Sequence, residues 1–317
     1  MSNSNTGVMF IDFLSFTFDM DEDSREGMVR FFHSATTDIG SMYYPTYEMR
    51  RYGYRHGFQF CINRDTRETC KVFYDNWRPN CSYIRIVYNP SKVDSDGQEA
   101  IEETFEILTW NCQDYALDSI RITRLDITVD IEDVLIDQLL VSAPRLQKSC
   151  LYCSPTGTTQ SLYIGDKNSN LHYCIYDKNR NQHLPHEYEE PIITRFEART
   201  KRSMSPIELP LIANPLANLS VVELDLLSDR TQFQRIDCWF LDSCRYRGMQ
   251  AALRLCRDSR TRTRYRDIIN DAGAAAWWDP TSLWDAFVTD HMRPIMNLFE
   301  TPFTPPHFRR RRRRQAR

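Results

Sequence analysis

The segment ITRLDITVDI at residues 122–131 constrains the fold most, because its polar and apolar residues alternate as in a β-strand. Successive strand side chains point to opposite faces, and one face is the mostly apolar set Thr123, Leu125, Ile127, Val129 and Ile131. The opposite face carries Arg124, Asp126, Thr128 and Asp130. Aspartate is depleted in strands because its side chain bonds to its own backbone, so two aspartates on one strand face need a reason. The segment is either an ordinary solvated strand face or the floor of a site that binds a cation.

Two later segments repeat this design, with one apolar face and one face of reactive groups. Residues 171–178 place on one side His172, Cys174, Tyr176 and Lys178. Residues 192–201 place on one side Arg195, Glu197, Arg199 and Lys201. If the three strands are neighbours in one sheet, these polar faces meet at a single site.

The combined groups predict attack on a phosphodiester by tyrosine. Carboxylates without histidine or cysteine form a hard-oxygen site, which suits Mg²⁺ or Mn²⁺ better than Zn²⁺. The hydroxyl of Tyr176 is a weak nucleophile, with an unperturbed pKa of about 10, and would need a metal ion or the ammonium of Lys178 to gain phenolate character. Arginines beside the carboxylates supply bidentate phosphate contacts. Each member also has an ordinary structural explanation: a half-buried sheet tyrosine, an Arg124–Asp126 ion pair, or a solvated Arg195–Glu197 ladder.

The rest of the chain alternates strands and helices, which predicts the α+β class, with a mainly antiparallel sheet covered by helices on one face. We expect strands at residues 8–18, 69–74, 82–88 and 162–164, and helices at 26–36, 98–111 and 133–146. Within residues 42–60, the segment YGYRHGFQF suggests two strands round a tight turn. Further helices are expected at residues 216–226, 233–256, 264–271 and 280–298. These ranges divide the chain into a catalytic domain at 1–205, a smaller helical domain at 206–300 and a flexible tail at 301–317. Trp277, Trp278 and Trp284 are expected to pack the helical domain rather than stack on bases.

Charge is distributed unevenly along the chain. The formal net charge is −3, but residues 309–317 hold seven arginines and leave 33 basic against 43 acidic residues in the remainder. A second block at residues 245–266 holds eight arginines and one acid, and is either a solvated helix face or a contact for a polyanion. From that block we expect contacts to the DNA backbone by Arg254, Arg257, Arg260, Arg262 and Arg264.

Other features bound the class of protein. No apolar run approaches 18 residues and the first residues are polar, which predicts a soluble intracellular protein with no membrane partner. The ten cysteines are expected to be free thiols, and the single C-x-x-C at Cys150 and Cys153 lacks the second pair of a zinc site. No G-x-x-x-x-G-K-[ST] loop occurs, so any unwinding must come from a partner or from superhelical tension.

Four motifs resemble those of a known family, in the family's order. TRLDITVD, LYIGDKNSN with CIYDKNRNQ, and TRFEART are similar to motifs of rolling-circle replication initiators, the family that includes the filamentous-phage replication nickase and a large class of plasmid initiators. The earlier IRIVYNPSK resembles a segment that precedes these motifs in the phage-type members. The resemblance covers about residues 80–203.

The resemblance implies site-specific nicking and joining of DNA at a replication origin, through a covalent 5′-phosphotyrosine intermediate and a divalent metal ion. By matching motif, Tyr176 is the nucleophile, Lys178 its supporting cation, and Asp126 and Glu197 metal ligands; Asp130 is a weaker third ligand. Arg124, Arg195 and Arg199 are expected to contact DNA. A host helicase and polymerase are the implied partners in a bacterial cytoplasm, and a homodimer would suit an enzyme that both opens and reseals a strand.

One departure and two alternatives accompany this expectation. The histidine-hydrophobic-histidine metal motif of other rolling-circle nucleases is missing, since His183 and His186 form HLPH; the chain belongs to a carboxylate branch or has lost the metal site. One alternative is a metal-dependent nuclease that uses water, with Tyr176 purely structural. The other is a non-catalytic nucleic-acid-binding or virion-associated protein that acts through its basic segments.

Overall fold

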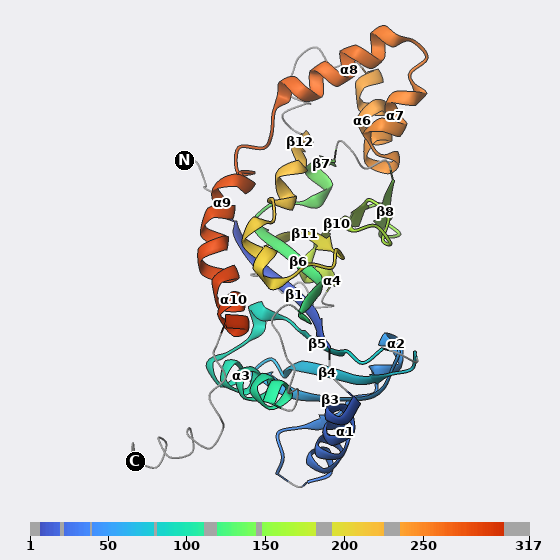
Figure 1. The fold of residues 1–317 in the computed structure, drawn as a ribbon. Helices are drawn as coiled ribbons and strands as arrows, with labels where there is room; N and C mark the ends of the chain where they lie inside the picture. The colour runs from blue at the N-terminus through green and yellow to red at the C-terminus, as the bar shows by residue number, and fades with distance from the viewer. Residues whose placement is uncertain are drawn as a thin grey trace. The chain divides into compact units, whose positions relative to one another are not determined.

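The computed structural model describes residues 7–19, 22–38, 40–78, 81–110, 119–143, 148–181, 192–224 and 235–300 (Figure 1). Contacts between Cα atoms divide the chain into two compact units. The first unit comprises residues 1–10, 126–201 and 212–288, and the second comprises residues 11–125, 202–211 and 289–317. The domain division expected at residues 205 and 300 stays a prediction. Within the described residues, no helix combines the length and the apolar character needed to cross a membrane.

The second unit contains an antiparallel sheet made from the N-terminal third of the chain. Its strands, in spatial order, are β2 (Tyr44–Pro45), β3 (Tyr54–Asn63), β4 (Glu68–Asn76), β5 (Ile84–Tyr88) and β1 (Val8–Phe18, from Ile11 onward). Its helices are α1 (Glu22–Thr37), α2 (Met49–Tyr52), α3 (Ser95–Trp110) and α10 (Arg293–Glu300), with short 3₁₀ turns η1 (Pro90–Lys92) and η4 (Pro206–Leu211).

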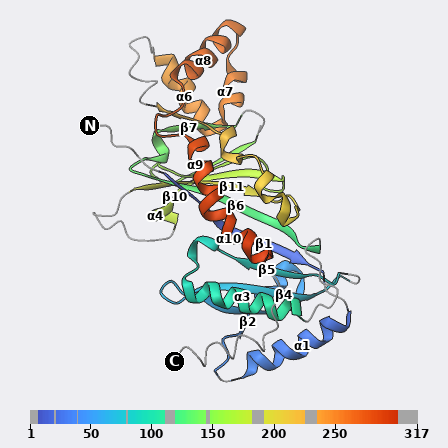
Figure 2. The same ribbon diagram turned by 60° about the vertical axis from the view of Figure 1, so that its left-hand side comes forward.

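Helices α1 and α3 cover one face of this sheet (Figures 1 and 2). Phe16 of β1 and Phe58 of β3 lie in the same row of paired residues, which runs across β5 and β4. Both rings are therefore on the same face of the sheet. Phe32 of α1 stacks on Phe58 with centroids 3.9 Å apart, and Phe105 of α3 meets Phe16 edge to face at 6.0 Å. The alternation of apolar residues along the strands therefore produces the helix-covered face that the sequence predicts.

The first unit contains a second group of five sheet strands. Their spatial order is β6 (Arg121–Glu132, from Asp126 onward), β11 (Ile193–Thr200), β10 (Leu171–Asp177), β9 (Thr159–Ile164) and β8 (Ser149–Cys153). The pairs β11–β10, β10–β9 and β9–β8 are antiparallel, and the one-turn helix α4 (Lys178–Asn181) directly follows β10. The buried apolar face of this group of strands includes Ile127, Val129, Ile175 and Phe196.

A small two-stranded sheet in the same unit supports helices from the C-terminal half. Strand β7 (Leu139–Ser142), preceded by the 3₁₀ turn η3 (Ile136–Gln138), pairs with β12 (Ser220–Glu223), which follows the turn η5 (Pro215–Asn218). The helices of this unit are α6 (Arg235–Arg247), α7 (Met249–Leu255), α8 (Ser259–Ala272) and α9 (Pro280–Phe287). The π-helical segment η6 (Val288–Met292) follows α9, and its residues from Thr289 onward belong to the second unit. Leu140, Val222, Phe240 and Tyr265 share one apolar cluster, so α6 to α8 pack on this sheet.

The α+β class and the strands around the polar faces are confirmed, whereas two expected helices are wrong. Residues 133–146 form η3 and β7, with residues 144–146 outside the described chain, and residues 216–224 form η5 and β12. Dense apolar runs such as VLIDQLLV fit either period, and the pairing of Val141 with Val221 decides for strands. The expected hairpin in YGYRHGFQF is wrong too: α2 ends at Tyr52 and the remainder is the single strand β3.

The helix expected at residues 233–256 is interrupted at Gly248. This residue has φ of +79°, a conformation that favours glycine, and an added Cβ would meet the Ser149 hydroxyl at 2.7 Å. The tryptophans are packed, but Trp278, expected to pack the helical domain, is buried against the sheet, with its ring 4.7 Å from Phe196 of β11. Trp284 lies 5.1 Å from Phe287. Trp277 contributes a hydrogen bond from Nε1 to Glu223.

Candidate active site

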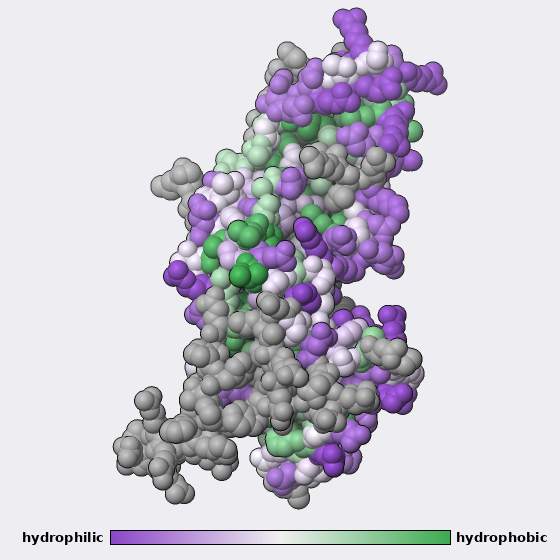
Figure 3. All heavy atoms as spheres, viewed as in Figure 1, coloured by the Kyte–Doolittle hydropathy of each residue, from purple (hydrophilic) through white to green (hydrophobic). Residues whose placement is uncertain are grey.

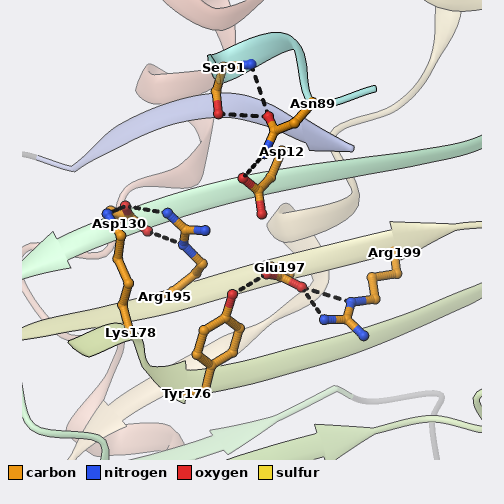
Figure 4. A network of polar contacts seen from close by, with 9 residues as sticks. All are labelled: Asp12, Asn89, Ser91, Asp130, Tyr176, Lys178, Arg195, Glu197 and Arg199. Atoms are coloured by element: carbon orange, nitrogen blue, oxygen red, sulfur yellow. Dashed lines mark hydrogen bonds and ion pairs between the residues drawn. The ribbon is translucent and has the colours of Figure 1, made fainter. Parts of the chain in front are cut away.

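Strand pairing places Tyr176 beside a buried glutamate. In the register of β10 with β11, Tyr176 faces Arg195 and Cys174 faces Glu197, and the period of two puts all four side chains on one face. Tyr176 is only 8% exposed, and its hydroxyl donates to Oε1 of Glu197 at 2.5 Å (Figure 4). The phenol thus points along the sheet at a carboxylate instead of at solvent.

Arg199 links Glu197 to Asp126. Its Nε donates to Oε2 of Glu197 at 2.7 Å and lies 3.8 Å from Oδ2 of Asp126. Both acidic side chains are deeply buried, with 3% exposure each. β6 and β11 are neighbours in the strand order, so the first unit alone brings together Asp126, Tyr176 and Glu197. The three residues lie 21 to 71 positions apart along the chain and converge only because the sheet pairs their strands.

Burial and charge set the protonation of this group. Burial, followed by the charge and hydrogen bond of Glu197, raises the pKa of Tyr176 above its ordinary value, and Arg195 offsets only part of that rise. For Arg199, burial lowers the pKa but the neighbouring carboxylates outweigh burial, so its pKa is raised and the guanidinium stays charged. The phenol is therefore a neutral donor in the resting protein, and Glu197 is its acceptor.

A second cluster surrounds Asp130. Arg195 donates to both oxygens of Asp130, at 2.6 and 2.8 Å, and Lys178 donates to Oδ2 at 3.0 Å (Figure 4). The Arg195 guanidinium also lies 5.2 Å above the ring of Phe10. Burial would raise the pKa of Asp130, but hydrogen bonds and charges from Arg195 and Lys178 outweigh it and hold the pKa below its ordinary value. Asp130 thereby holds the ammonium of Lys178, which begins α4 two residues after Tyr176.

The carboxylates divide into a pair and a single member. Within the described part of the chain, no group of three or more His, Cys, Asp or Glu side chains is placed to hold a metal ion. Asp126 and Glu197 share Arg199, whereas Asp130 is bonded to Arg195 and Lys178. Two carboxylates together with phosphate and water oxygens are a donor set that Mg²⁺ takes, so Asp126 and Glu197 fit such an ion without Asp130. Binding of Mg²⁺ or Mn²⁺ stays a prediction.

The predicted DNA-contacting arginines lie in different places. Arg124 belongs to the second unit, with its guanidinium 4.1 Å above the ring of Phe13. Arg195 and Arg199 bind carboxylates inside the candidate site. The remaining five are exposed on α7, on α8 and between them: Arg254, Arg257, Arg260, Arg262 and Arg264. Figure 3 shows hydrophilic side chains gathered over α8, and an open hollow of about 500 Å³ runs along it beside Arg260 and Arg264.

Three neighbours of the site had no assigned role in the sequence-based hypothesis. His172 faces Arg199 across the strand pair and Cys174 faces Tyr163 of β9. Burial raises the pKa of Cys174 to about 11 and that of Tyr163 to about 12, so both are neutral at physiological pH. His172 and Cys174 have the same strand parity as Tyr176, which is the signal that could have identified them.

Comparisons with known proteins give little at the level of sequence. No protein-family model matches the chain, and a search of the curated proteins finds no match. Among solved structures the chain is similar to a rolling circle replication initiator protein from Geobacillus stearothermophilus, with a TM-score of 0.40 and 18% identity over 72% of this chain and 90% of that chain. At that TM-score and identity, the similarity does not assign a function to this chain. A function must be argued from the chain's own residues.

Proposed function

We propose that the protein is a DNA nicking and joining enzyme in which the hydroxyl of Tyr176 attacks a backbone phosphorus. The observation that supports this most directly is the hydrogen bond from the Tyr176 hydroxyl to the buried carboxylate of Glu197. An ordinary sheet tyrosine buries its ring and leaves the hydroxyl at water or backbone. Here the hydroxyl meets a charged acceptor that can receive its proton, in a cluster that also carries Lys178 and Arg199.

The proposed reaction moves one proton and exchanges one phosphorus–oxygen bond for another. Glu197 takes the phenolic proton as the oxygen of Tyr176 forms its bond to phosphorus, and the bond from phosphorus to the 3′ oxygen breaks. The 3′ oxygen takes up a proton from water, and Glu197 returns its proton to solvent. The products are a 5′-phosphotyrosine and a free 3′ hydroxyl, and attack by a 3′ hydroxyl on the phosphotyrosine reverses the sequence and joins the strand.

The other residues of the cluster have positioning and electrostatic roles. Lys178 and Arg199 are the partly exposed cations of the cluster and would contact the phosphate oxygens. Arg195 is buried against Asp130 and so fixes the acceptor that holds Lys178. A bound Mg²⁺ or Mn²⁺, held by Asp126 and Glu197, would supply Lewis-acid polarisation of a phosphoryl oxygen.

A biological setting follows from this chemistry. A 3′ hydroxyl at a defined nick is a primer, so we propose that the site acts at a replication origin, where a polymerase extends the strand and a separate helicase opens the duplex. The exposed arginines of α7 and α8 would hold the DNA backbone without reading its sequence.

The test uses the full chain and a supercoiled plasmid that carries the DNA flanking the coding sequence. The parent protein should nick the plasmid and leave a protein–DNA adduct that survives denaturation, whereas Tyr176→Phe should bind the DNA normally and give neither product. Nicking without an adduct would favour the nuclease that uses water. Normal nicking by Tyr176→Phe would exclude the proposal, and binding without nicking by the parent would favour a non-catalytic nucleic-acid-binding protein.

A further inference from the structure

A surface in the second unit exposes three aromatic rings to solvent. Tyr44 is 58% exposed, Tyr47 is 85% exposed and Trp77 is 57% exposed. Single exposed aromatic residues are common on proteins, but several in one place usually mark a binding surface.

Backbone hydrogen bonds place Tyr47 and Trp77 near opposite ends of helix α2, and Tyr44 lies three residues before Tyr47. Strand β2 pairs with β3 so that Tyr44 lies opposite Gln59, and the next contact, from Thr46 N–H to the Gly57 carbonyl, carries the chain to Tyr47. Helix α2 follows and ends at Tyr52, and the carbonyl of the next residue, Gly53, accepts the N–H of Trp77 at 3.0 Å. Tyr47 therefore lies just before α2 and Trp77 lies against its end.

Arginines alternate with these rings. Arg50 and Arg51 occupy the last turn of α2, and Arg78 follows Trp77; all three are exposed. We call the set Tyr44, Tyr47, Arg50, Arg51, Trp77 and Arg78 the Trp77 surface.

The acidic groups next to this surface are already neutralised. Glu48 accepts from Lys71 at 2.6 Å, and Asp75 lies 3.7 Å from both Arg55 and His56. The three arginines of the Trp77 surface thus remain as an excess of positive charge. This contrasts with the net negative charge of the chain outside residues 309–317.

We infer that the Trp77 surface binds single-stranded DNA without sequence preference. Bases of a single strand stack on exposed aromatic rings, and arginines beside the rings contact the phosphates. A duplex hides the faces of its bases, so it could use only the arginines. The inference deepens the proposed function and rests on it only for the source of the strand, since a nicked and opened origin supplies one.

The test measures binding of a fluorescein-labelled oligo-dT of about 12 nucleotides to the full chain by fluorescence anisotropy. Stacking of a base on one ring corresponds to roughly 5- to 150-fold in affinity, so Trp77→Leu should raise the Kd by about tenfold. Trp77→Phe keeps an aromatic face and should bind within about twofold of the parent, and it should lose the quenching of tryptophan fluorescence by the oligonucleotide. Affinity for a duplex of the same length should not change in Trp77→Leu.

Matched variants separate stacking from general effects. Tyr152→Ala removes a similarly exposed ring from β8 in the other unit and should bind oligo-dT like the parent. Tyr47→Ala tests a second ring of the Trp77 surface and should weaken binding by about fivefold; because Tyr47 is more exposed, this variant decides the question if Trp77→Leu does not fold.

Two results would overturn the inference. One is unchanged oligo-dT affinity in folded Trp77→Leu and Tyr47→Ala, which would assign the surface to a protein partner or to none. The other is an equal loss of oligo-dT and duplex affinity, which would leave no role for stacking. The proposed nicking function is judged separately by the adduct of Tyr176, so either idea can fail while the other stands.

Discussion

Arg199 binds Glu197 through two of its guanidinium nitrogens, at 2.7 and 2.5 Å, and the two residues stand two positions apart on the same face of β11. The same guanidinium lies 3.8 Å from Asp126. A fixed positive charge thus sits between two buried carboxylates, where a divalent cation would have to bind. Arg199 should therefore compete with a metal ion for these oxygens as well as stabilise them.

Replacing Arg199 with Met should make the carboxylate pair depend on a divalent cation. Without added metal the variant should lose roughly 3 kcal/mol of unfolding free energy, because two buried charges are left without their partner. Its Kd for Mn²⁺ should fall by about tenfold, measured by electron paramagnetic resonance of free Mn²⁺, and Mn²⁺ should raise its Tm more than that of the parent. Arg199→Lys keeps the charge and serves as the control. Equal Mn²⁺ affinity in all three proteins would contradict competition.

Replacing Glu197 with Gln should make the phenol of Tyr176 easier to ionise while reducing catalysis. Besides burial, the charge of Glu197 raises the pKa of Tyr176, so removing this charge should lower that pKa. In ¹³Cζ-labelled protein, one tyrosine resonance should then titrate at a lower pH than in the parent. Nicking should nevertheless fall by about 10²-fold or more, since the proton acceptor is gone. The signal is identified by its absence in Tyr176→Phe. A titration of that resonance at unchanged or higher pH would show that the two groups are not coupled.

Asp130 should contribute stability at neutral pH that is lost in acid. Its pKa lies below the ordinary value when folded, so the carboxylate stabilises the protein above its unfolded pKa of about 4, and the contribution disappears as pH falls through the lower folded value. Asp130→Asn should cost about 3 kcal/mol at pH 7, since Arg195 keeps a buried charge. The difference in Tm between parent and variant should shrink as the pH falls below about 4 and approaches the lower folded pKa. A constant difference across that range would mean that the pKa of Asp130 is not lowered.

The exposed arginines of α8 should contribute to DNA affinity through charge alone. Removing one arginine that binds a phosphate reduces the slope of log K against log salt by about 0.9, so Arg260→Gln with Arg264→Gln should reduce it by about 1.8 for any DNA sequence. The Tm should change little, because both side chains are exposed and Arg264 lies only at the edge of cation–π range, 5.7 Å from the centroid of the Tyr265 ring. Arg64→Gln, an exposed arginine in the β3–β4 turn, provides the matched control. An unchanged slope would remove α8 from the DNA-binding surface.

The polar strand faces could be predicted from the sequence because strand side chains alternate with a period of two. That rule alone placed Asp126 with Asp130, Tyr176 with Lys178, and Glu197 with Arg195 and Arg199. It also gave the class of fold, since amphipathic strands need helices over one face. It failed at residues 133–143 and 216–224 of the described chain, where dense apolar runs satisfy two periods and long-range pairing of β7 with β12 made the choice.

The partners of each charged group were decided by tertiary structure only. The sequence put three carboxylates and five cations on three strands, with nothing to say which cation meets which acid. The register of β10 against β11 turned the hydroxyl of Tyr176 to Glu197, and the order of β6 beside β11 brought Asp126 to Arg199 while Asp130 went to Arg195. Alternation is a local property of a strand, whereas pairing depends on residues far apart in the chain, and it is pairing that forms the site.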